Sequence, residues 1–108
     1  MLRSLSTLLV LTAFISPQTA YSADKAAGEK KYKETCINCH GPAGKGVASY
    51  PKISGNEISY TTAKLEIYRK GEKVGSNSFL MIPMAKPLTD EDIADLAAYL
   101  KDAKYTVE

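Results

Sequence analysis

Cys36-Ile37-Asn38-Cys39-His40 contains the only two cysteines and the only histidine of this 108-residue chain. The five residues form a C-x-x-C-H pattern, the pattern by which a c-type haem is attached. Two thiols at this spacing, on a turn or short helix, can bond to the two vinyl groups of one porphyrin. The imidazole of the next residue then lies under the ring and can ligate the iron. The sequence therefore predicts one covalent haem c, bonded through Cys36 and Cys39, with His40 as the proximal iron ligand.

The N-terminus has the composition of a secretory signal: a positive charge, an apolar run at 5–15 and then small residues. The apolar run is shorter than the roughly 20 residues that a membrane-spanning helix needs, so a signal peptide is favoured over a retained anchor. We predict a signal peptide at 1–22, with cleavage after Ser22 or Ala23. The mature domain at 23–108 is then periplasmic and has no membrane span.

Charge and size limit the classes of function. The net charge is +2, and removal of Arg3 with the signal leaves +1. The lysines are scattered along the chain rather than clustered, which argues against a nucleic-acid partner. A domain this small has a modest core and usually needs a disulfide, a metal or another cross-link to be stable. A covalent haem would supply that support as a large apolar plate around which helices pack.

Three segments of the mature chain have helical patterns. The first is 26–35, and the second is 57–70, where Gly71 follows at the position of a left-handed C-cap. The third is 89–102, in which Thr89 is a good N-cap and three acidic residues follow at the positive end of the helix dipole. Its apolar stripe consists of Ile93, Leu96, Ala97 and Leu100.

Two long irregular segments connect these helices. The segment 41–55 is rich in glycine and proline, which favours a loop. The segment 71–86 shows no clear periodicity and is apolar near its end, where it contains Met81 and Met84. Because there is no second histidine, a methionine thioether is the natural second axial ligand, and it raises the reduction potential of a haem.

The order of these features resembles that of the class I c-type cytochromes: C-x-x-C-H, a Gly/Pro loop, a middle helix, a methionine loop and a C-terminal helix. More closely, residues 50–55, Tyr60, 68–71 and 88–99 look like one half of the two-haem periplasmic cytochromes. They also look like the haem subunit of flavocytochrome c sulfide dehydrogenase. The resemblance covers about residues 26–101. It implies an all-α class I cytochrome c fold, with three to four helices packed around one covalently bound haem.

The resemblance also implies roles for single residues at the haem. The family places its methionine ligand about eight positions before the residue that caps the last helix, which points to Met81, with Met84 as the fallback. Pro51 matches the family's proline, whose carbonyl accepts a hydrogen bond from the second nitrogen of the ligating His40. Such a bond orients the imidazole and raises its basicity.

The same resemblance implies how the two terminal helices pack. Gly28 and Tyr32 match the family's glycine and aromatic residue on the first helix. These residues cross the C-terminal helix at Leu96 and Tyr99. A glycine inside a helix is often kept where another backbone approaches closely.

The implied function is an electron carrier, not an enzyme, with redox proteins such as a reductase, an oxidase or a flavoprotein as partners. Lys45, Lys52 and Lys86 are candidates for the docking surface beside the exposed haem edge near Cys39. The alternative is the electron-accepting haem subunit of a larger redox enzyme, such as a sulfide-oxidising flavocytochrome.

Three other classes of function are alternatives for the C-x-x-C-H stretch. A thiol–disulfide enzyme would need a βαβ setting around the two cysteines. A structural zinc site needs four ligands, and the C-x-x-C-H stretch supplies three within one turn. A haem sensor would use the same C-x-x-C-H stretch but would leave the sixth coordination position open.

Overall fold

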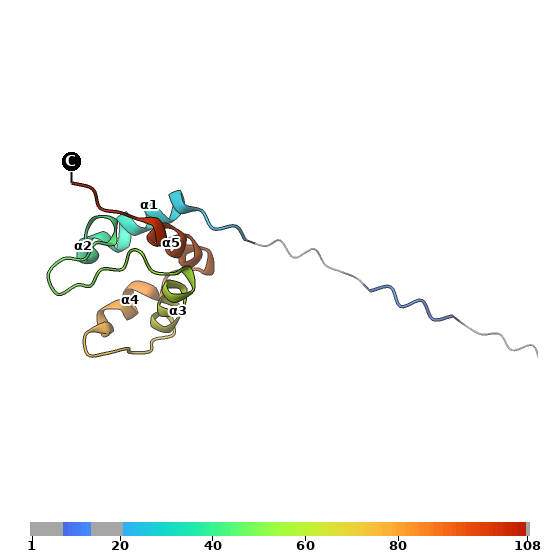
Figure 1. The fold of residues 1–108 in the computed structure, drawn as a ribbon. Helices are drawn as coiled ribbons and strands as arrows, with labels where there is room; N and C mark the ends of the chain where they lie inside the picture. Colours follow the sequence, from blue (N-terminus) through green and yellow to red (C-terminus); the bar gives the residue numbers. More distant parts are fainter. Residues whose placement is uncertain (1–7, 14–20, 108) are drawn as a thin grey trace, which may run out of the picture.

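The computed structural model describes residues 8–13 and 21–107, and within them the fold is all-helical, with no β-strand (Figure 1). The all-α prediction is confirmed. Besides the three long helices α1, α3 and α5, there are two short helices, α2 and α4. The elements in chain order are α1 (Lys25–Thr35), α2 (Ile37–His40), the 3-10 helix η1 (Pro42–Gly44), α3 (Ile58–Arg69), the 3-10 helix η2 (Ser78–Leu80), α4 (Met81–Ala85) and α5 (Asp90–Asp102).

Most of the predicted signal peptide at 1–22 lies outside the described residues. Residues 8–13 and 21–24 are in extended chain without helix. Across the described parts of the chain, every helix is too short or too polar to cross a bilayer.

The crossing of α1 and α5 forms one side of the core (Figure 1). A Cβ atom added at Gly28 would lie 2.0 Å from the backbone oxygen of Asp95 and 3.0 Å from the Cβ of Tyr99, so the two backbones are nearly in contact. One turn later, the fully buried Tyr32 packs its ring 5.5 Å from the ring of Tyr99. The predicted crossing of Gly28 and Tyr32 over the last helix is confirmed, with Asp95 as the nearest neighbour of Gly28.

A capping box starts α5 at the predicted residue. The Thr89 hydroxyl accepts a hydrogen bond from the Asp92 N–H, and the Asp92 carboxylate accepts one from the Thr89 N–H, each at 3.0 Å. These bonds satisfy backbone donors that a helix start leaves free. The predicted apolar stripe is confirmed, since Ile93, Leu96, Ala97 and Leu100 are all buried.

The middle helix α3 packs against both α5 and α4. It buries Thr61 and Leu65, which are four residues apart and therefore on one face. Gly71 follows the end of α3 with φ +85°, the left-handed conformation that the sequence predicts there.

The apolar part of the 71–86 segment is more regular than predicted, because η2 and α4 occupy residues 78–85. A single helical turn is too short to show a 3.6-residue periodicity in the sequence, which explains the difference. Pro83 is compatible with α4, since it lies in the first turn, where backbone N–H groups have no partner within the helix. Burial of Ala85 and packing of Met81 against the core position this turn.

The chain before α1 is attached to α5 through Asp95, which is only 7% exposed. The Asp95 carboxylate accepts hydrogen bonds from the Asp24 N–H at 2.8 Å and from the Tyr21 hydroxyl at 2.6 Å. The bond to the carboxylate raises the pKa of Tyr21 to about 12. Cleavage at either predicted position would remove the Tyr21 contact and keep the one from Asp24.

Candidate cofactor site

A cavity of about 720 Å³ lies between the C-x-x-C-H turn, α3 and α4. This volume is in the range of small-molecule and cofactor sites. Its walls include both cysteines, the histidine and both candidate methionines. The methionines are about 40 residues after the C-x-x-C-H stretch in the chain. The floor is apolar and contains Leu65, Leu96 and Leu100, which also belong to the hydrophobic core.

His40 is buried, with 6% of its surface exposed, and it lines this cavity. Its Nδ1 lies 2.9 Å from the carbonyl oxygen of Pro51. A carbonyl oxygen only accepts hydrogen bonds, so Nδ1 carries the hydrogen and donates it. In a neutral imidazole that donates from Nδ1, Nε2 keeps its lone pair and can ligate a metal ion.

Glycines in the loop after α2 allow Pro51 to reach the imidazole. Gly46 has φ +87°, and a Cβ atom there would lie 2.8 Å from the backbone nitrogen of Lys52. The Gly46 N–H donates to the His40 carbonyl at 2.7 Å, and the Ile53 N–H donates to the Gly44 carbonyl at 2.9 Å. These bonds fold the loop back on itself and bring Pro51 beside His40.

The two thiols are free and adjacent to His40, with Cys36 at the N-cap of α2 and Cys39 inside it. Burial, with a smaller contribution from the nearby Cys39, raises the pKa of Cys36 to about 11. A thiol–disulfide enzyme needs the opposite, a thiol with a lowered pKa. Among the described residues, no three histidine, cysteine, aspartate or glutamate side chains are grouped as a metal site would need.

Met81 and Met84 both line the cavity from α4. Their spacing of three residues places them on one face of the helical turn. Met81 is partly buried and packs against the core, whereas Met84 is 44% exposed. Both methionines therefore border the cavity, and Met81 is the more buried of the two.

Residues 25–104 match the family model described as cytochrome c. The chain belongs to the cytochrome c family. It is an electron carrier rather than an enzyme, and its Cys36, Cys39 and His40 form the attachment site of one covalent haem c. Haem supplies an iron that changes between the ferrous and ferric states.

Its relatives differ in how much of their length this chain covers. It is 48% identical to cytochrome c-554(548) of Halomonas halodenitrificans over 72% of this chain and 94% of that protein. It is 36% identical to the thiosulfate dehydrogenase electron acceptor of Stutzerimonas stutzeri over 69% of this chain and 35% of that protein. The crystal structure of reduced cytochrome c4 from Pseudomonas stutzeri superposes with a TM-score of 0.63 at 27% identity, over 76% of this chain and 50% of that one. The chain thus spans half or less of the last two.

The cavity of this cytochrome fits a haem by the chemistry of its walls. The two free thiols could bond to the vinyl groups of such a haem, and the imidazole and a methionine thioether are groups that could ligate its iron. The apolar floor suits the porphyrin ring. The cysteine pair, the imidazole and the two methionine side chains thus surround one cavity.

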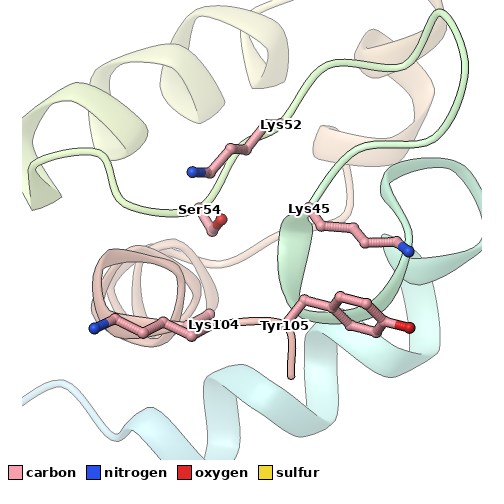
Figure 2. Close-up of a pocket in the computed structure, with 6 residues that line it drawn as sticks. Lys45, Lys52, Ser54, Lys104 and Tyr105 are labelled. Carbon is pink, nitrogen blue, oxygen red and sulfur yellow. The ribbon is translucent and has the colours of Figure 1, made fainter. Parts of the chain in front are cut away.

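Two of the three lysines predicted for docking lie together at a second hollow, of about 490 Å³ (Figure 2). Lys45 and Lys52 line this hollow with Lys104, and the Lys45 ammonium lies 3.9 Å from the ring centroid of Tyr105. Lys52 also lines the haem cavity, so the two hollows adjoin. Lys86 lies outside this group, at the end of α4.

Lys64 lines the haem cavity from α3, and no role was predicted for it from the sequence. A signal was present, because Tyr60, Lys64 and Tyr68 are spaced four residues apart and therefore share one face of the helix. Tyr60 and Tyr68 both belong to the family resemblance. A lysine between them on that face lies in the same wall of the cavity.

Proposed function

We propose that this cytochrome is a periplasmic carrier of single electrons, with its haem iron ligated by His40 and Met81. The observation that supports the proposal is the shared cavity. An imidazole whose Nδ1 is bonded to Pro51 lines it together with the cysteine pair and the Met81 thioether.

The polypeptide contributes orientation and exclusion of water. The Pro51 carbonyl restrains the imidazole of His40 and makes its free nitrogen a better donor. A methionine thioether is neutral and soft, and it favours the reduced iron relative to a second histidine. Leu96 and Leu100 shield the ring from water, so that a change in iron charge reorganises little of its surroundings.

Alanine substitution of each methionine tests the axial ligand. Met81→Ala is expected to abolish the charge-transfer band of methionine-ligated ferric haem and to lower the reduction potential, because the soft ligand is lost. Met84→Ala is the matched control and should keep the band. The opposite pattern would identify Met84 as the ligand. Retention of the band in the Met81→Ala variant would refute Met81 as the ligand, and absence of the band from the wild-type protein would refute methionine ligation.

We also propose that residues 1–22 are removed on export. The mass of the protein purified from the periplasmic fraction should correspond to a chain that begins at Ala23, or at Asp24 for the alternative cleavage. The same mass should include one covalent haem. A chain that retains Tyr21, or that fractionates with membranes, would contradict this proposal.

A second candidate is the haem subunit of a larger redox enzyme. The relative named as the electron acceptor of thiosulfate dehydrogenase favours an enzyme as the partner. The hollow at Lys45, Lys52 and Lys104 is a candidate contact surface, because it adjoins the haem cavity. Purification from the native source separates the two candidates, since a subunit elutes in stoichiometric complex with an enzyme and a free carrier elutes alone.

A further inference from the structure

The charged side chains in the wall of the haem cavity are all cationic. Among the described residues that line it, there are two lysines, Lys52 and Lys64, and no aspartate or glutamate. The chain as a whole has 12 acidic residues, and none of those described lines this cavity. A cavity with this charge pattern suits an anionic group.

Lys64 is the better placed of the two lysines. It is half-buried on α3, whereas Lys52 is exposed and also borders the hollow in Figure 2. The Lys64 ammonium lies 5.5 Å from the ring centroid of Tyr60, which is 54% exposed and lines the cavity. The ammonium is therefore at the rim of the cavity, where a carboxylate could also contact water.

Lys64 has no anionic partner within the described part of the chain. The six ion pairs found there involve other residues. The Lys64 ammonium therefore has no electrostatic attraction to an acidic side chain there. An anion in the cavity would supply one.

We infer that the Lys64 ammonium pairs with a propionate carboxylate of the haem. The inference rests on the proposed haem function. A porphyrin with its vinyl groups bonded to Cys36 and Cys39 still has two ionised carboxylates, and these are its anionic groups. Asn56 and Tyr60 line the same cavity and offer neutral hydrogen-bond donors.

This pairing has two consequences for the haem. The ammonium stabilises the ionised carboxylate and so lowers the pKa of that propionate. It also opposes the additional positive charge of ferric iron, which raises the reduction potential. Lys64 is thus a positioning residue that tunes the haem without ligating it.

The test compares two neutral substitutions in the mature holoprotein, one within α3 and one at its C-cap residue. Lys64→Gln removes the proposed contact, and Lys70→Gln removes an exposed charge outside the cavity. Lys64→Gln should lower the ferrous-to-ferric ratio about fivefold at a fixed ambient potential. The pH at which the potential changes should also rise, because the propionate pKa is no longer lowered. Lys70→Gln should change neither, and Lys64→Arg should restore both.

Haem content measured by absorbance separates the possible failures. If wild-type protein matured with haem available carries none, the proposed function itself is wrong. If Lys64→Gln carries haem and matches Lys70→Gln in both potential and pH dependence, the pairing is wrong and the haem function stands. Lys64→Met, neutral and similar in length, is measured by the same criteria where the glutamine variant yields no holoprotein.

Discussion

At Gly28 the backbones of α1 and α5 are so close that there is no room between them for a methyl group. The nearest atom to an added Cβ is a backbone oxygen, that of Asp95 at 2.0 Å, and a backbone atom cannot rotate away as a side chain can. The sequence shows that a glycine is present in a helix. The family resemblance indicates close packing there, but only the fold shows which atom requires the glycine.

Gly28→Ala is therefore expected to destabilise the holoprotein by about 1–3 kcal/mol, the usual cost of overpacking a core. At a free helical position the same change would stabilise by up to about 1 kcal/mol, so the sign of the effect is diagnostic. Urea unfolding followed by circular dichroism measures it. Ala26→Gly, on the exposed side of α1, is the control for helix propensity and should cost about 1 kcal/mol. A stabilised Gly28→Ala protein would contradict the close crossing.

Asp95 is buried, and the sequence did not predict its burial. It lies within the helix beside the predicted apolar stripe, and an aspartate there is normally assigned to the solvent face. Its partners, Tyr21 and Asp24, are more than 70 residues earlier in the chain, so a local pattern has no information about them. A carboxylate is tolerated at this depth because the backbone of Asp24 donates to it.

Among the elements, α5 was the most predictable because its signals are local. Its N-cap, its acidic first turn and its apolar stripe all lie within the helix itself. The turn α4 is the opposite case. Its conformation depends on Ala85 and Met81 packing against a core that other segments build.

Loss of the capping box should weaken the start of α5. Thr89→Ala removes the hydroxyl that accepts from Asp92 N–H, and we expect the free energy of unfolding to fall by about 1 kcal/mol. Thr106→Ala, in the exposed tail after α5, is the matched control and should have no measurable effect. The measurement is the midpoint of urea unfolding at constant haem content. Equal midpoints for the two variants would show that the capping box contributes little.

At the scale of the whole molecule, the haem cavity and the core are one structure. Leu65, Leu96 and Leu100 contribute to both. Without haem, these apolar side chains would face water and lose part of their hydrophobic stabilisation. A small domain has a total stability of only about 5–15 kcal/mol, so such a loss matters to it.

The polypeptide made without haem attachment is therefore expected to lack this packed structure. Far-ultraviolet circular dichroism should show reduced helix, and heating should give no sharp unfolding transition. The holoprotein of the same sequence is the control, and it should unfold cooperatively. A haem-free chain with the thermal midpoint of the holoprotein would show that the helices pack without the haem.

The haem attachment, the order of the long helices and their caps could be predicted from the sequence because each depends on residues close together in the chain. The C-x-x-C-H spacing, the Thr89 cap and the periodicity of α5 are of this kind. Only the tertiary structure decided the contact of Gly28 with Asp95 and the placement of Lys64 at the cavity rim. These features join segments distant in sequence, and their energies depend on burial and distance, which exist only once the chain has folded.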